Sequence, residues 1–353
     1  MERKASKLIL SEGAYDRLAI VGGGAWGTAL ALTLLRAGRS CCLWIREPEA
    51  ATAAREDRRN PFLADHELPT ALTISNHLQE SLEGAEAVVL VVPSQFLRPL
   101  ARELKERLTG SETIVICSKG IEADSGALMH QVVEEEMPGR PWAVLSGPSF
   151  AAEVAGGQPT AVTIAARDRE LAAKVAATFA TPTFRPYVSE DPIGVEVGGA
   201  VKNVLAIACG IASGCGFGAN ARAALITRGL AEIMRLGRAL GARRETLSGL
   251  AGIGDLTLTC SSEQSRNFSF GKALGRGLTA EEAQAGSKVV VEGAENARSV
   301  TALARRLGVE MPICEAVHQI LYRELPLEEA MQSLLTRPLK GEVEDEASFA
   351  VES

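Results

Sequence analysis

Residues 17–31, RLAIVGGGAWGTALA, constrain the fold of this chain more than any other stretch. The apolar run that opens it predicts a buried β-strand, and an alanine- and leucine-rich helix is expected to follow to about Gly38. Between them Gly22, Gly24 and Gly27 have the G-x-G-x-x-G spacing of a turn that binds a dinucleotide pyrophosphate. These glycines permit the turn, the approach of the phosphates and close helix packing, and the helix start offers free N–H groups to the anion.

The first half of the chain alternates between strand and helix patterns. Strands are predicted at 17–21, 41–45, 71–74, 86–92, 113–117, 142–146, 160–165 and 183–188, and helices at 27–38, 48–57, 94–108, 125–136 and 168–180. This alternation predicts an α/β fold with a Rossmann-like, doubly wound and mostly parallel sheet.

From about residue 190 helical spacing replaces the alternation. Helices are predicted at 194–213, 219–241, 265–275, 279–285, 293–308, 312–322 and 326–335. We therefore expect four parts: an N-terminal extension at 1–16, a dinucleotide-binding Rossmann domain at 17–190, an all-α substrate domain at 191–338, and an acidic, disordered tail at 339–353.

Composition narrows the range of partners. The net charge of −7 leaves no general cationic surface for nucleic acid, and aromatic residues make up only 4 % of the chain. No apolar run approaches the roughly 20 residues that span a bilayer. The seven cysteines include no C-x-x-C pair, so we expect free thiols, a cytoplasmic location and no metal site.

The end of the second strand bears on the choice of coenzyme. A carboxylate there binds the 2′-hydroxyl of the ribose of NADH, whereas an arginine accommodates the 2′-phosphate of NADPH. Arg46 and Glu47 are neighbours, so an extended strand points their side chains to opposite faces. The spacing leaves open which one faces the ribose; we favour NADPH, with NADH also used.

Two glycine- and serine-rich loops follow predicted strands. In SKG at 118–120, Lys119 lies at the carboxyl end of a strand, where ligands bind in open α/β sheets. In SGPSFA at 146–151, small residues predict a tight loop whose backbone N–H groups face a ligand.

The helical half carries two further polar groups. Lys202 and Asn203 interrupt a nearly apolar helix at 197–214. Burial favours the neutral amine and suits Lys202 to proton transfer, unless the side chain reaches the surface. In the segment 249–271, Asp255 follows two glycines. Ser265, Arg266 and Asn267 lie at a predicted helix start, where a planar guanidinium and free N–H groups suit a phosphate.

Together these segments resemble the NAD(P)-dependent glycerol-3-phosphate dehydrogenase family of bacterial type. The resemblance covers about residues 17–335 and depends on several motifs in the family's order: GGGAWGTALA (22–31), PSQ (93–95), SKG (118–120), SGPSFA (146–151), GGAVKNVLAIACG (198–210), GANARAALITRGLAE (218–232), GLAGIGDLTLTC (249–260), SRN (265–267) and VEG (291–293). The chain departs from the family in reading GGG for the commoner GAG, and in having Ala219 where many members are acidic.

The resemblance implies a role for each motif. Lys202 is the proton-transferring catalytic residue, and the substrate site comprises Lys119, Gly147, Ser149, Lys202, Asp255, Ser265, Arg266 and Asn267, with Thr259 in the same loop. The coenzyme site comprises Gly22, Gly24, Ala25, Trp26, Gly27, Arg46, Lys119, Ala151, Arg266, Val290 and Glu292.

The implied reaction is reversible hydride transfer between NADPH or NADH and dihydroxyacetone phosphate, giving sn-glycerol 3-phosphate for glycerophospholipid synthesis. Lys119 and Asp255 are expected to position the Lys202 amine. Two alternatives remain: another two-domain dehydrogenase, such as a hydroxyacid or ketopantoate reductase, and a dinucleotide-binding redox sensor without activity. A homodimer is a further expectation, because the low-charge helix at 197–214 offers a surface for a partner subunit.

Overall fold

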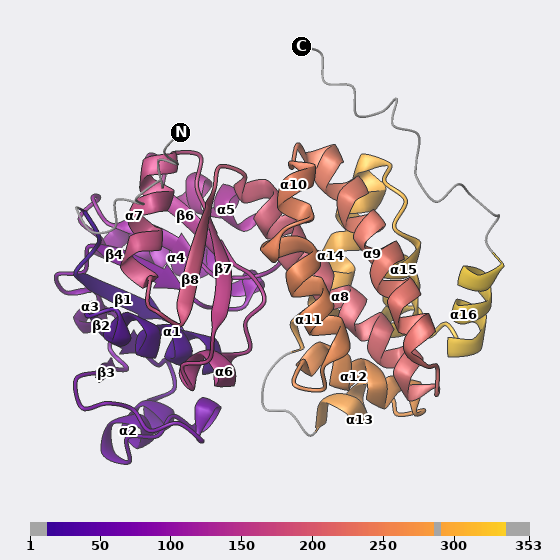
Figure 1. The fold of residues 1–353 in the computed structure, drawn as a ribbon, viewed down its shortest axis with the longest axis horizontal. Coiled ribbons are helices and arrows are strands. Elements are labelled where there is room, and N and C mark those ends of the chain that lie inside the picture. The colour runs from indigo at the N-terminus through magenta and orange to yellow at the C-terminus, as the bar shows by residue number, and fades with distance from the viewer. Residues whose placement is uncertain (1–12, 286–290, 337–353) are drawn as a thin grey trace, which may run out of the picture.

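The computed structural model describes residues 13–285 and 291–336. Figure 1 shows an α/β half, built on one sheet, beside an all-helical half. The strands are β1 (Arg17–Val21), β2 (Ser40–Trp44), β3 (Thr73–Ser75), β4 (Ala87–Leu90), β5 (Thr113–Ile116), β6 (Trp142–Ser146), β7 (Thr160–Ala165) and β8 (Phe184–Ser189).

These eight strands form one sheet in the order β3-β2-β1-β4-β5-β6-β7-β8. All neighbours pair in parallel except β6 and β7, which confirms the predicted, mostly parallel sheet. Because β1 pairs with both β2 and β4, the strand order reverses at β1. A crevice at the carboxyl ends of the strands is expected at such a reversal, and the glycine turn lies there.

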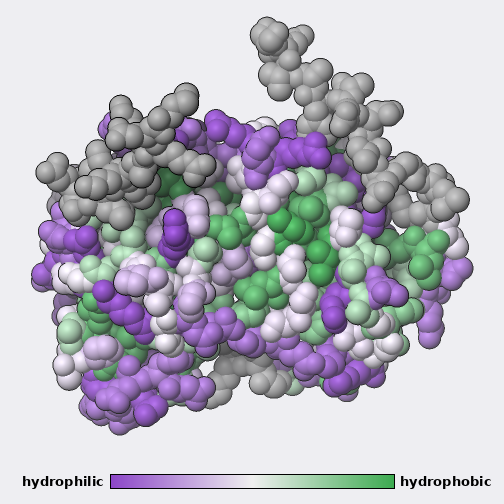
Figure 2. All heavy atoms as spheres, viewed as in Figure 1, coloured by the Kyte–Doolittle hydropathy of each residue, from purple (hydrophilic) through white to green (hydrophobic). Residues whose placement is uncertain are grey.

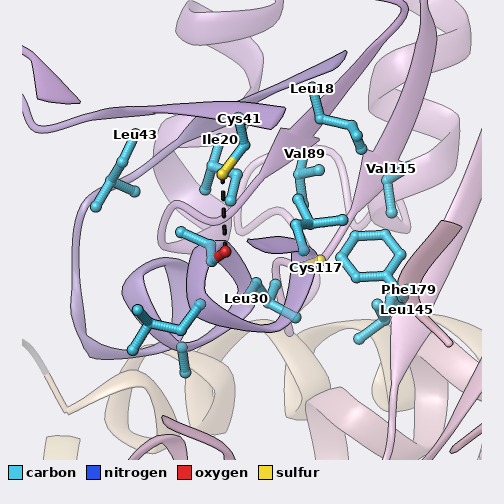
Figure 3. Close-up of a cluster of buried hydrophobic side chains, with 14 of the residues drawn as sticks. Leu18, Ile20, Leu30, Cys41, Leu43, Val89, Val115, Cys117, Leu145 and Phe179 are labelled. Atoms are coloured by element: carbon cyan, nitrogen blue, oxygen red, sulfur yellow. Dashed lines mark hydrogen bonds between the residues drawn. The ribbon is translucent and has the colours of Figure 1, made fainter. Parts of the chain in front are cut away.

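Helices cover both faces of the sheet. They are α1 (Ala25–Arg36), α2 (Pro48–Glu56), α3 (Leu78–Leu82), α4 (Leu97–Arg107), α5 (Met129–Glu136), α6 (Ala151–Ala155) and α7 (Arg169–Phe179), with 3₁₀ turns η1 (Pro61–Leu63) and η2 (Ser94–Phe96). Figure 3 shows one of the two cores beneath them, where Ile20, Leu30 and Phe179 converge from β1, α1 and α7. Burial of these apolar side chains holds the glycine turn in place at the carboxyl end of β1.

The predicted extension at 1–16 ends inside this core. Tyr15 is buried, and its hydroxyl lies 2.5 Å from the hydroxyl of Thr113 on β5. The rest of the extension that precedes residue 13, and the predicted acidic tail at 339–353, lie outside the described residues.

The helical half is built around one long helix, α8 (Pro192–Gly214), which packs against α9, α11, α12, α14 and α15. The remaining elements are α9 (Ala219–Leu240), α10 (Arg244–Leu247), the π-turn η3 (Leu250–Gly254), α11 (Asp255–Ser261), α12 (Arg266–Gly275), α13 (Ala280–Ala285), α14 (Glu292–Leu307), α15 (Pro312–Tyr322) and α16 (Leu327–Leu335). Asp191 caps α8 by accepting a hydrogen bond from the Gly194 N–H, and Pro192 occupies a first-turn position, which proline favours.

Two expectations about the segment that forms α8, concerning its apolar length and its exposure to a partner subunit, are wrong. It is long and apolar enough to cross a bilayer, although no run of that kind was expected, but 94 % of its most apolar window is buried inside the protein. It is a core helix, and its central lysine would be costly in a bilayer. For the same reason α8 does not offer the predicted surface to a partner subunit, because its apolar faces are already covered by helices of its own chain.

Helices α8 and α12 approach each other through glycine. A Cβ atom on Gly210 would lie 2.1 Å from the carbonyl oxygen of Phe268, and one on Gly271 would lie 2.1 Å from that of Ile207. The two backbones are therefore in direct contact, with no side chain between them at these positions.

Candidate functional site

The glycine turn between β1 and α1 has the geometry that its sequence predicts. Gly22 has φ of +124°, and a Cβ there would lie 2.2 Å from the carbonyl oxygen of Val91. A Cβ on Gly27 would lie 1.9 Å from the carbonyl oxygen of Gly22. Both positions therefore require glycine, one for the conformation of the turn and the other for its contact with the helix.

The start of α1 has room for an anion. Gly24 is exposed and a Cβ added to it meets nothing within 4 Å, while α1 begins at Ala25 with no side-chain cap on its free N–H groups. Trp26 follows, and its buried indole N–H has no partner among the described residues. This cradle fits the pyrophosphate of a dinucleotide.

Arg46 and Glu47 are arranged differently from the expectation. They do not point to opposite faces; the Arg46 guanidinium pairs with the Glu47 carboxylate at 3.2 Å. The physical reason is that β2 ends at Trp44, so both residues lie in a bend beyond the strand. Both side chains are at least half exposed, and a 2′-phosphate can take the place of Glu47 beside the guanidinium.

The centre of the site is one carboxylate shared by two lysines. Asp255 opens α11, a helix that the sequence analysis does not predict. Its Oδ1 lies 2.5 Å from Nζ of Lys202 on α8, and its Oδ2 lies 2.9 Å from Nζ of Lys119, just after β5. Lys202 Nζ also donates to the Thr259 hydroxyl at 3.1 Å. The expected contact of Asp255 with the Lys202 amine is thus present, while Lys119 approaches that amine through the shared carboxylate, which joins the two halves of the chain.

The two lysines titrate differently despite sharing a counterion. Burial, with the positive charge of Lys119 nearby, lowers the pKa of Lys202 to about 8. Burial also lowers the pKa of Lys119, but the Asp255 carboxylate outweighs it, so the net shift is upward. The Asp255 pKa falls because the two ammonium groups outweigh its own burial. Such divergence separates an amine that titrates near neutral pH, Lys202, from one that stays charged, Lys119.

The loop after β6 forms another wall of the site. Gly147 has φ of +148°, and a Cβ there would lie 2.9 Å from the Cα of Val162. The Ser149 hydroxyl donates to the Gly147 carbonyl at 3.0 Å, which keeps the loop tight, and Ala151 begins α6 directly after it.

The predicted phosphate end lies at the start of α12. Ser265 is the N-cap, its hydroxyl accepting from the Phe268 N–H at 3.2 Å, and Arg266 is the exposed first residue. The Asn267 amide donates to Asn203 at 2.9 Å and accepts from the Gly293 N–H at 2.9 Å. One N–H of that amide is not used by the residues that the structure describes and is available to a phosphate.

The last predicted coenzyme residues lie near the start of α14. Glu292 opens this helix, and burial raises the pKa of its carboxyl against the opposing effect of Arg266, Lys119 and Lys202. Its carboxylate therefore lies within electrostatic range of these three cations. Val290 lies outside the described residues.

Two buried amides for which no site role was predicted also contact the site residues. Asn203 supports Asn267 and is next to Lys202. Asn296 on α14 is fully buried and donates to the backbone carbonyls of Lys119 and Ala200. A signal for Asn296 is visible in the sequence, since a polar residue occupies the face of α14 that otherwise presents Ala297, Val300 and Ala304 to the core.

Comparisons with known proteins show the family of the chain. Residues 17–172 match the family model described as NAD-dependent glycerol-3-phosphate dehydrogenase N-terminus, and residues 191–332 match the C-terminus. The glycerol-3-phosphate dehydrogenase [NAD(P)+] of Rhodospirillum rubrum is 54 % identical over 93 % of this chain and 94 % of its own, and that of Caulobacter vibrioides is 50 % identical over 93 % and 99 %.

A solved structure extends the likeness to three dimensions. The crystal structure of glycerol-3-phosphate dehydrogenase from Coxiella burnetii superposes with a TM-score of 0.89 at 42 % identity, covering 91 % of this chain and 99 % of that one. Because the two family models match residues 17–172 and 191–332 and the Rhodospirillum rubrum relative is 54 % identical, this chain belongs to the NAD(P)-dependent glycerol-3-phosphate dehydrogenase family.

Proposed function

We propose that the protein catalyses reversible hydride transfer between NAD(P)H and dihydroxyacetone phosphate, with Lys202 as the proton-transferring residue. The observation that carries the proposal is the Asp255 carboxylate, which holds one permanent ammonium and one titrating amine at the carboxyl edge of the sheet. Membership in the family makes the chain an NAD(P)-dependent oxidoreductase that acts on CH–OH groups. This argues against both alternatives, a ketopantoate reductase and an inactive sensor. Oxidation of NADPH followed at 340 nm with dihydroxyacetone phosphate tests it, and no turnover with either coenzyme contradicts it.

The chain's own residues supply positioning and charge. The bound nicotinamide supplies the hydride in reduction and accepts it in oxidation. Lys202, as an ammonium, donates a proton to the oxygen of the ketone as negative charge develops there; in the reverse direction its neutral amine takes that proton. Lys119 remains charged, and its field stabilises the same oxygen. Asp255 holds both amines at fixed positions.

Arg266 and Asn267 are proposed to hold the substrate phosphate. Arg266→Ala is expected to lower kcat/KM for dihydroxyacetone phosphate by about 10–10²-fold, the effect of losing a charge-assisted hydrogen bond. With the coenzyme saturating, so that a contact of Arg266 with it does not enter the ratio, kcat/KM for unphosphorylated dihydroxyacetone is expected to stay nearly unchanged, and the preference for the phosphate shrinks. Steady-state assays with both substrates measure the ratio.

Arg276→Ala, at the other end of α12, is the matched control for that variant and is expected to keep the wild-type ratio. If Arg266→Ala and Arg276→Ala preserve the same preference for the phosphorylated substrate, Arg266 does not bind the phosphate.

Arg46 is proposed to favour NADPH over NADH. Arg46→Ala is expected to lower kcat/KM for NADPH about tenfold while sparing NADH, because only NADPH carries the 2′-phosphate. Arg55→Ala, an arginine of α2 that bonds to Thr52 and Asn76, is the control. An unchanged ratio of the two coenzymes in Arg46→Ala contradicts this role.

We further propose that the protein is a cytosolic homodimer that supplies glycerol 3-phosphate for glycerophospholipid synthesis. Each chain is proposed to divide at residues 190/191 into a coenzyme domain and a substrate domain. All seven cysteines are free, which suits a reducing compartment. Figure 2 shows apolar side chains gathered on the viewed face of the helical half, and a subunit contact there would cover them. Sedimentation velocity distinguishes dimer from monomer.

A further inference from the structure

One buried amide links the two lysine-bearing segments through their backbones. Asn296 is 0 % exposed, and its Nδ2 lies 3.1 Å from the carbonyl oxygen of Ala200 and 3.3 Å from that of Lys119. Ala200 lies two residues before Lys202 on α8. The amide thus joins the loop that carries Lys119 to the helix that carries Lys202.

Only asparagine or its longer homologue glutamine suits these two acceptors among small uncharged side chains. A carboxamide nitrogen carries two N–H groups, one for each carbonyl, whereas a hydroxyl has a single proton to donate. The opposite orientation of the amide would place its oxygen against two carbonyl oxygens, so the acceptors fix which way it points.

The same loop is confined on its other sides. A Cβ on Gly120 would lie 2.2 Å from the Ser94 hydroxyl oxygen and 2.8 Å from Asn296 Oδ1, so the loop fits between the two. A Cβ on Gly199 would lie 3.5 Å from Cγ of Lys119, which shows that the lysine stem crosses α8 at that glycine. The backbone of Lys119 is therefore held by Asn296, its stem rests on α8, and its ammonium is bound to Asp255.

We propose that Asn296 is a positioning residue for hydride transfer, because its amide fixes the Lys119 loop against α8 and so sets the separation of the two amines that share Asp255. This inference rests on the proposed function. Asn296 does not reach the reacting atoms; it acts through the two lysines. A displacement on the order of 1 Å in a catalytic group costs about 10²-fold in rate.

The separation of the amines also affects titration. The titratable groups that act on or respond to Lys202 are Lys119, Asp255, Cys260 and Glu292, of the described residues. If Lys119 moves away, its repulsion of the Lys202 charge weakens and Asp255 pairs more fully with Lys202. Both changes raise the pKa of Lys202 from its value of about 8.

The test compares Asn296→Ala with Thr301→Val. Thr301 lies on the same helix, is 2 % exposed, and donates its hydroxyl only within α14, to the carbonyls of Ala297 and Arg298. Asn296→Ala is expected to lower kcat for reduction about 10²-fold and to move the alkaline limb of its pH profile to higher pH. Thr301→Val is expected to change thermal stability only.

A second readout is independent of turnover. Competitive acetylation of Lys202 across pH, read by mass spectrometry, reports the titration of its amine in the free protein. An upward shift in Asn296→Ala supports the proposal even if dihydroxyacetone phosphate is not the substrate, whereas absence of wild-type turnover contradicts the proposed function alone. The proposal is overturned if Asn296→Ala and Thr301→Val have the same kcat, the same alkaline limb and the same acetylation profile.

If Asn296→Ala does not fold, Asn296→Ser, which keeps one hydrogen-bond donor, takes its place. This variant is expected to show a smaller shift of the Lys202 titration in the same direction, and no shift overturns the proposal.

Discussion

Replacing Lys202 with methionine is expected to lower kcat by about 10²–10⁴-fold, the usual contribution of general acid–base catalysis. Methionine preserves much of the length of the side chain and suits its buried position, but it has no proton to transfer. The dissociation constant for NADPH, measured by fluorescence, is expected to stay within about threefold, because the glycine turn that holds the pyrophosphate is formed by other residues.

The wild-type pH profile provides a second measure of the same role. Reduction needs the ammonium form of Lys202, so its rate is expected to be level below pH 8 and to fall above it, where the pKa is about 8. Oxidation needs the neutral amine and is expected to rise through the same pH. Both limbs are expected to disappear from the residual activity of Lys202→Met.

Lys272 gives the matched control, since it lies in the same helical half and pairs with Glu263 instead of Asp255. Lys272→Met is expected to keep wild-type kcat and both limbs. Near-wild-type turnover in Lys202→Met would remove Lys202 from the proton-transfer step.

Asp255→Asn is the second substitution with a large expected effect. It leaves two buried amines without their shared counterion, and breaking a buried ion pair from one side costs about 3–5 kcal/mol. The pKa of Lys202 is expected to fall below its value of about 8, because the repulsion by Lys119 remains while the attraction is lost. We therefore expect a lower melting temperature, at least a 10²-fold loss of kcat, and an alkaline limb displaced to lower pH.

The direction of that displacement is the informative result, because it is opposite to the one expected for Asn296→Ala. Asp191→Asn is the control: Asp191 is also buried, and it accepts from the backbone N–H groups of Gly194 and Arg243 without contacting a lysine. This variant is expected to lower stability without moving the limb. An unmoved limb in Asp255→Asn would show that Asp255 does not control the charge of Lys202.

The sheet and the long helices were predictable because their patterns are regular. β4 (AVVL) is apolar and buried throughout, and α8, expected at 194–213, spans Pro192–Gly214. Helix α11 was not predicted, because its sequence DLTLTCS alternates like a strand. Its contacts with α8 and the preceding π-turn override that local preference.

The places of Lys119, just after a strand, and of Arg266, at a helix start, were predictable because both follow from regular local patterns. The arrangement of Arg46 and Glu47 was not, because it depends on where β2 ends. Asn296 was missed although it interrupts the buried face of α14, because that pattern indicates a buried polar residue but not its partners, which are backbone carbonyls far away in sequence.

The glycine contact between α8 and α12 fixes how far apart the helices that carry the two proposed substrate contacts, Lys202 and Arg266, can lie. Lys202 lies on one of these helices and Arg266 begins the other, and at Gly210 and Gly271 their main chains already touch. Direct backbone contact thus fixes the separation of the two main chains that carry the proposed proton donor and the proposed phosphate-binding arginine. A homologous ketone with one more methylene before its phosphate would have to bend, or displace one helix along the other, to contact both Lys202 and Arg266.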